Sequence, residues 1–173
     1  MLIKDVQVGL FGRGEWINMT REERFFWTLL LIIMLVSYGF AILQIFAAVG
    51  FSPGQIMTHY RGNEAEMLSG MAFKDLARLS HIHASGMSLL FIPAAFILAR
   101  YVGIKPRWKR VLLLAGFGGI LLDIASWWGI VYLGAAALPL LFAAGALFGL
   151  GMAGASLLAL KWMWFTEKGK MVA

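Results

Sequence analysis

Long apolar runs alternate with short polar segments along the chain, and this pattern predicts a membrane protein. Four of the runs are long enough to cross a bilayer as helices, since each span needs about 20 apolar residues. They cover residues 25–49, 80–101, 110–133 and 139–163. We therefore expect an all-α fold, a four-transmembrane-helix bundle, in which residues 25–165 form one membrane domain.

The segment between the first two predicted spans, residues 50–79, differs from the tight turns elsewhere. Its first part, "FSPGQIMTHYRG", interrupts the helical pattern. Its second part, 63–79, places Met67, Leu68 and Met71 among charged residues in a loosely amphipathic pattern. Such a pattern is typical of a short helix lying at the membrane surface. We expect this helix to lead into the second span without a break.

Composition supports the membrane assignment and removes several kinds of chemistry. Hydrophobic residues make up 61% of the 173 residues and charged residues only 14%, with a mean hydropathy of +0.79. No soluble domain of this length buries so much apolar surface. The chain contains no cysteine, which excludes disulfides, thiolate metal sites, covalently attached c-type haem and thiol catalysis.

The net charge of +6 is distributed asymmetrically. Twelve of the fifteen Lys and Arg residues lie before the first span, in the 100–110 loop or from Lys161 onward, and three lie in residues 50–79. The positive-inside rule predicts a bacterial inner-membrane protein with both termini cytoplasmic and residues 50–79 outside. The cytoplasmic parts include an amphipathic segment, 1–24, and a tail, 166–173. This placement indicates contact with membrane lipid and not with nucleic acid.

The three histidines, His59, His81 and His83, all fall on the predicted outer side. Imidazoles at this depth can bind metal or haem, carry protons or satisfy hydrogen bonds. Residues two apart on a helix point about 200° from one another, so His81 and His83 cannot both face one small ligand. We expect His83 to face the bundle because it lies deeper.

These residues leave several cofactors open. Haem b would need His59 with one of the other two histidines, or a His with a Met such as Met87. Copper accepts imidazole and thioether, so His59, His81 and His83 also form a candidate metal site. Three further hypotheses remain. The histidines could bind a quinone, they could carry protons, or they could bind no cofactor and simply be solvated or lie at the membrane interface.

Asp123 is the only acidic residue inside a predicted span, about 15 Å below the outer end of its helix at 1.5 Å per residue. A charge at that depth costs several kcal/mol unless it is paired or protonated. Helical spacing puts Trp127 on the same face, where its ring could line a quinone or porphyrin site. We expect Asp123 to pair with His83, where it could either orient the imidazole or accept a proton from a quinol. The alternative is that Asp123 serves packing only, with hydrogen bonds to Ser126, Tyr38 or a Trp indole.

Small residues recur at four-residue intervals in the last predicted span, at Gly145, Gly149 and Ala153. Such spacing lets helix backbones approach closely. The span is therefore expected to pack tightly against a sister helix, another subunit or a flat cofactor.

The order of "HYRG", "FKDLARLSHIH" and "LLDIASWW" resembles small bacterial membrane proteins of respiratory electron-transfer gene neighbourhoods, over roughly residues 25–165. The resemblance directs attention to His59, Tyr60, Gly62, His81, His83 and Asp123. It implies a role beside a respiratory complex but supplies no reaction.

We therefore expect a small integral-membrane subunit or anchor of a respiratory electron-transfer complex, holding haem, metal or quinone near the outer face. Its partners would be other membrane or periplasmic subunits such as a cytochrome, and it would act as part of a redox complex more than as an enzyme alone. The alternative is a structural or assembly subunit without cofactor that packs partner helices.

Overall fold

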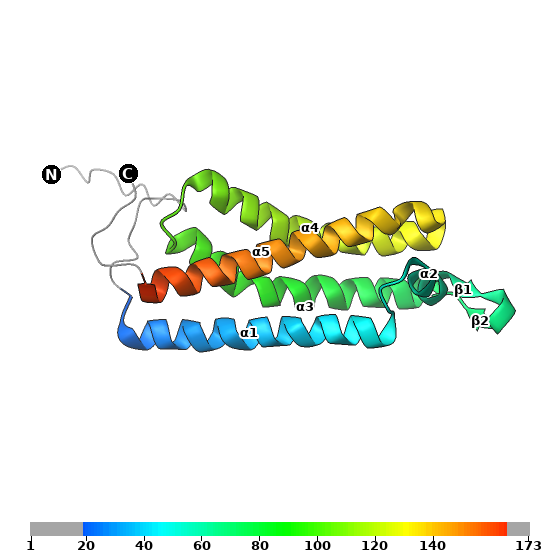
Figure 1. Ribbon diagram of the computed structural model, residues 1–173, viewed down its shortest axis with the longest axis horizontal. Helices are drawn as coiled ribbons and strands as arrows, with labels where there is room; N and C mark the ends of the chain where they lie inside the picture. Colours follow the sequence, from blue (N-terminus) through cyan, green and yellow to red (C-terminus); the bar gives the residue numbers. More distant parts are fainter. Residues whose placement is uncertain (1–18, 166–173) are drawn as a thin grey trace.

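A computed structural model describes residues 19–165, and these are almost entirely helical. The elements are α1 (Arg21–Ala48), α2 (Pro53–Arg61), β1 (Gly62–Asn63), η2 (Glu64–Glu66), β2 (Leu68–Ser69), α3 (Phe73–Arg100), α4 (Pro106–Leu133), η3 (Gly134–Ala137) and α5 (Leu138–Phe165). The four long helices run along the longest axis, with α2 and the β1–β2 hairpin at one end (Figure 1). We call this the capped end. Most of the predicted 1–24 segment and the 166–173 tail lie outside the described residues.

Within residues 19–165, three helical stretches are long and apolar enough to cross a membrane. They are Arg21–Ala48, Phe73–Arg100 and Pro106–Phe165. The third stretch contains α4, η3 and α5, and α5 runs back beside α4 after the turn at the capped end (Figure 1).

The segment that follows α1 differs in part from the sequence expectation: of the predicted surface helix over 63–79, residues 73–79 are helical and continue into the second span, but residues 63–72 are not helical. Residues 62–69 instead form an antiparallel hairpin that pairs Gly62 with Ser69, and α3 starts at Phe73. A helix occupies Pro53–Arg61, where the sequence was expected to break. The cause is a capping box, in which the Ser52 and Gln55 side chains bond each other's backbone amides, with Pro53 in the first turn.

Helices α4 and α5 pack with their backbones in close contact. A Cβ on Gly119 would lie 2.6 Å from the backbone nitrogen of Phe148, and one on Gly151 would overlap Gly116. Gly149, in turn, faces the Tyr38 hydroxyl. The glycines of these two helices therefore serve helix packing at Gly116, Gly119 and Gly151, as small residues do in membrane bundles.

Helix α1 lies at the edge of the bundle. Among its residues only Leu31 is buried, and its contacts with the other helices are few. Trp27 packs against Phe96 of α3 with a ring-centroid distance of 5.9 Å, and the Trp164 indole of α5 donates to the Thr28 hydroxyl. Met34, Leu35 and Tyr38 also pack against the core, while many apolar side chains of α1, such as Phe40 and Phe46, are exposed.

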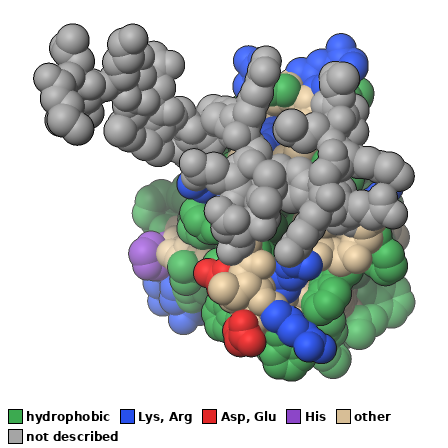
Figure 2. Space-filling view, turned by 90° about the vertical axis from the view of Figure 1, so that its left-hand side faces the viewer, with side chains coloured by type: hydrophobic (Ala, Val, Ile, Leu, Met, Phe, Trp, Pro, Cys, Tyr) green, Lys and Arg blue, Asp and Glu red, His purple; other side chains and the backbone are tan. Residues whose placement is uncertain are grey.

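The end of the bundle opposite the cap is rich in basic residues, and Lys and Arg side chains are visible there in Figure 2. One of them, Lys109, is buried, and its ammonium group donates to the Ala99 carbonyl at 2.9 Å. This bond satisfies a carbonyl in the last turn of α3, where a cation is favourable to the helix dipole.

Candidate functional site

Helix α2 is held against the bundle by its apolar face. Ile56 and Tyr60, one turn apart on α2, are buried in a cluster that includes Leu76 of α3 and both Trp127 and Ile130 of α4. The Tyr60 ring stacks on the Trp127 ring with a centroid distance of 6.4 Å. The cap thus places a phenol directly over the polar side chains that α3 and α4 carry at this end.

A contact between an imidazole of α3 and a carboxyl group of α4 forms the centre of the candidate site. His83 Nε2 lies 3.4 Å from Asp123 Oδ2. The two side chains are 28% and 14% exposed, respectively. The structure thus confirms that His83 faces the bundle and meets the acid of the third predicted span. An imidazole and a carboxylate at this separation can share or exchange a proton.

Trp127 connects this pair to the cap. Its ring meets the His83 ring edge-on, with centroids 4.6 Å apart, and it lies one helical turn after Asp123 on α4. The Ser126 hydroxyl donates to the backbone carbonyl of Asp123 at 2.6 Å, so it does not engage the carboxyl. Because Trp127 is buried, the pair has an apolar wall on the side toward α2.

The contact between Tyr60 and Trp127 was not predicted, because Tyr60 lies outside the four predicted spans. Burial raises the pKa of the Tyr60 hydroxyl, and the nearby charge of Asp123 raises it further. The phenol therefore stays protonated and able to donate at neutral pH. The apolar spacing of Ile56 and Tyr60 after the "SPGQ" capping box is the sequence signal that could have predicted this contact.

A second polar contact between α3 and α4 lies one turn nearer the cap. The Trp128 indole donates to the Ser80 hydroxyl at 2.9 Å, and Phe73 and Tyr132 pack against the Trp128 ring. Ser80 precedes His83 by one helical turn, so this bond helps to fix the rotation of α3 that directs His83 toward Asp123.

The three histidines do not gather around one centre. His81 is exposed on the other side of α3, and the Ser85 hydroxyl donates to its backbone carbonyl. His59 is on α2, with its ring edge-on to Tyr60 at 4.9 Å. Within residues 19–165 no three His, Cys, Asp or Glu side chains are grouped so that they could hold a metal. The expected metal site of His59, His81 and His83 is not found there.

Met87 follows His83 by one turn on α3 and packs against the main hydrophobic core. Two side chains on one face of one helix cannot bind opposite sides of a haem iron, and the Nε2 of His83 is already directed at Asp123. The arrangement is therefore suited to proton exchange between His83 and Asp123, and these two residues with Tyr60 and Trp127 make up the candidate site.

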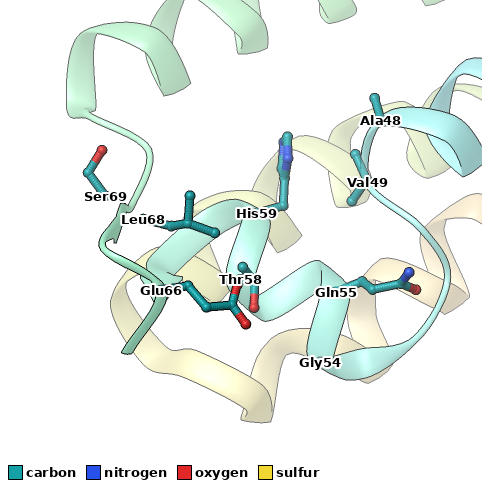
Figure 3. Close-up of a pocket in the computed structure, with 9 residues that line it drawn as sticks. All are labelled: Ala48, Val49, Gly54, Gln55, Thr58, His59, Glu66, Leu68 and Ser69. Carbon is teal, nitrogen blue, oxygen red and sulfur yellow. The ribbon is translucent and has the colours of Figure 1, made fainter. Parts of the chain in front are cut away.

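His59 lines a separate hollow beside the site. This cavity of about 610 Å³ is bounded by the end of α1, by α2, by η2 and by β2. Figure 3 shows the His59 ring between the end of α1 and the hairpin. The lining residues are Ala48, Val49, Gly54, Gln55, Thr58, His59, Glu66, Leu68 and Ser69.

Comparison with known proteins gives one match. No curated protein matches the chain, and no solved structure does. A family model described as a transmembrane helical domain matches residues 50–170, from the start of the cap to the end of α5 and beyond. Together with the apolar helices, this match shows a small, multi-pass integral membrane protein whose helices contact lipid. The chain belongs to this family of transmembrane helical domains, Aq_1264_TM.

Proposed function

We propose that the protein is a small membrane subunit of a respiratory electron-transfer complex, in which His83 and Asp123 take up protons from a quinol near the outer face. The observation that carries this proposal is the 3.4 Å contact between His83 and Asp123, made by two different helices under a cap of aromatic rings. Ionisable side chains inside a membrane domain are costly, and they commonly mark proton pathways.

The proposal includes an orientation in the bacterial inner membrane. The stretch Pro106–Phe165 crosses twice, as α4 and α5, so that the chain has four spans and both termini are cytoplasmic. The excess of Lys and Arg at the end opposite the cap supports this orientation. The capped end and the His83–Asp123 pair are then on the outer side.

Quinol oxidation at this site requires an electron acceptor in addition to His83 and Asp123. Oxidation of a quinol to a quinone releases two protons and two electrons. A neutral imidazole and a carboxylate can each accept one proton, so the pair has the capacity for both. The two electrons leave in two successive one-electron transfers, and haem of a partner cytochrome subunit can accept them if it is reoxidised between the transfers or if two haems are present. The resemblance to proteins of respiratory gene neighbourhoods supports such a partner.

Replacing either member of the pair tests the proposal. We expect His83→Gln and Asp123→Asn each to lower the rate of quinol-dependent electron transfer in native membranes by about 100-fold, the scale of a lost acid–base group. The assay uses a reduced, decyl-substituted benzoquinone and follows its oxidation. His81→Gln is the matched control, because this imidazole is exposed on the opposite side of α3.

The same membranes are tested for the amount of protein and of assembled complex. A normal rate in both variants, with normal assembly, would show that the pair has no part in electron transfer. Loss of the assembled complex in both variants, with normal activity per remaining complex, would favour the alternative of a structural or assembly subunit.

A further inference from the structure

We propose that the cavity beside His59 is the docking site for the quinone headgroup, on the side of Tyr60 and Trp127 away from the His83–Asp123 pair. This inference rests on the proposed function and adds the place where the substrate binds. It follows from the size of the cavity, from the side chains around it and from its position at the end of α1.

The cavity has the size and composition that a small ring needs. Its volume of about 610 Å³ is within the range of about 300–1,000 Å³ that holds small ligands. Ala48, Val49 and Leu68 offer apolar contacts, while Thr58 and His59 offer polar atoms from neighbouring positions of α2. A ring with an oxygen at each end matches a cavity that has both apolar and hydrogen-bonding sides.

His59 is the side chain best placed to bind a ring oxygen. Burial lowers the pKa of its imidazole, so the ring is neutral at pH 7 and has one donor and one acceptor nitrogen. It can therefore donate to a quinone oxygen or accept from a quinol hydroxyl. Glu66 is the one acidic side chain among the residues that line the cavity.

The cavity adjoins the proton-accepting pair through ring contacts. The His59 ring meets Tyr60 at 4.9 Å, Tyr60 stacks on Trp127 at 6.4 Å, and Trp127 meets His83 at 4.6 Å. A headgroup beside His59 is thus separated from His83 by two aromatic side chains. Tyr60 and Trp127 are both buried, so their packed rings form the wall between the cavity and the pair.

The surface next to the cavity suits the apolar tail of a quinone. Ala48 and Val49, which line the cavity, follow the strongly apolar end of α1. Phe46 and Phe51 pack against each other there at 5.7 Å, and both are at least half exposed. An isoprenoid tail can lie against these rings in the lipid while the headgroup occupies the polar cavity.

Binding measurements on the full-length protein in lipid nanodiscs test the site. The probe is a decyl-substituted benzoquinone, and its dissociation constant is measured for the parent protein and for variants. We expect His59→Ala to weaken binding about tenfold, the effect of losing one hydrogen bond to a ring oxygen. Leu68→Trp, at an exposed position, should fill the cavity and weaken binding at least as much. His81→Ala is the histidine control and should leave the constant unchanged.

Three other outcomes would contradict the proposed docking site. Unchanged binding in both His59→Ala and Leu68→Trp would place the headgroup elsewhere, and Thr58→Val repeats this test without removing a histidine. Full competition by a decyl phosphocholine at equal concentration would mean that the cavity takes a lipid headgroup. Equal losses in the His59 and His81 variants would show that neither loss is specific to the cavity.

The Asp123→Asn variant separates this inference from the proposed function. If both hold, it binds the probe normally and loses electron transfer. If Asp123→Asn keeps its rate while the His59 variant loses binding, only the proposed function is wrong. If Asp123→Asn loses its rate while the cavity variants bind normally, only the docking site is wrong.

Discussion

At the scale of single residues, the site depends on how Asp123 is accommodated inside the bundle. Its carboxyl meets the His83 imidazole at 3.4 Å, and the Trp127 ring packs edge-on against that imidazole. Removing one partner of a partly buried polar contact leaves the other group without its hydrogen-bonding partner, which costs more than the contact itself contributes. His83→Gln keeps a hydrogen-bonding group at this position, so it tests proton exchange with the least change in packing.

The protonation of His59 gives a pH-dependent prediction for the cap. Burial lowers the pKa of this imidazole when α2 is docked, whereas an undocked α2 has the ordinary value of about 6.5. The undocked form therefore binds a proton more readily, and docking is fully favoured above pH 6.5 and weakens as the pH falls below it. We expect faster amide hydrogen exchange in residues 53–61 at pH 5.5 than at pH 7.5, after correction for intrinsic rates.

His59→Gln is the control, because glutamine does not titrate in this range. The corrected exchange rates of its α2 should be equal at the two pH values. The same acceleration in His59→Gln as in the parent protein would assign the pH dependence to another group.

Helical spacing predicted the contact between His83 and Asp123, but it did not predict where Tyr60 and His59 lie. Successive residues of an α-helix are rotated by about 100°, which directs His83 toward the bundle, and His83 and Asp123 lie at similar depths in their two helices. These two facts predict the contact that the structure shows. The positions of Tyr60 and His59 depend on α2, which exists because of the Ser52–Gln55 capping box. A three-histidine metal centre was one candidate because the residues share one side of the membrane, but sharing a side does not determine how each ring is directed.

At the scale of elements, the close contact of α4 with α5 gives a second prediction. Gly119→Leu would drive a side chain into the backbone of Phe148, and overpacking of this kind typically costs about 1–3 kcal/mol. We expect a lower thermal unfolding midpoint in detergent micelles. The matched control is Gly145→Leu on α5, since a Cβ at Gly145 would have no neighbour within 4 Å. Equal midpoints for the two variants would contradict this packing role.

The structure of the segment between α1 and α3 could not be predicted from the spacing of apolar residues. The amphipathic pattern of 63–79 is real, but Gly62 has a φ of +80° and Met67 has a φ of +53°. Gly62 ends α2 and allows the chain to reverse as a hairpin, since a Cβ there would collide with the Leu68 carbonyl. These local conformations outweigh a weak helical periodicity. The long helices, in contrast, were predictable because their apolar runs leave no other structure in a bilayer.

At the scale of the whole molecule, the proposed topology can be tested because the chain has no cysteine. A single cysteine can therefore be introduced at Ser69 in the hairpin or at Lys105 between α3 and α4. With a membrane-impermeant maleimide on intact inverted and right-side-out vesicles, we expect Ser69→Cys to react only from the outer side. Lys105→Cys should react only from the cytoplasmic side.

Reaction of both cysteines from one side would contradict the proposed arrangement, because Ser69 and Lys105 flank α3 at opposite ends. An α3 that spans the membrane must separate them. Detergent-permeabilised vesicles provide the control, since both cysteines should then react whatever the orientation.

The loose attachment of α1 has a consequence for handling the protein. The family match begins at residue 50, after α1, and Leu31 is the only buried residue of that helix. Most of its surroundings are therefore lipid tails. Extraction into a short-chain surfactant would replace that environment first at α1, so the docking cavity, which uses Ala48 and Val49 as a wall, would be the part of the molecule most sensitive to the choice of solubilising agent.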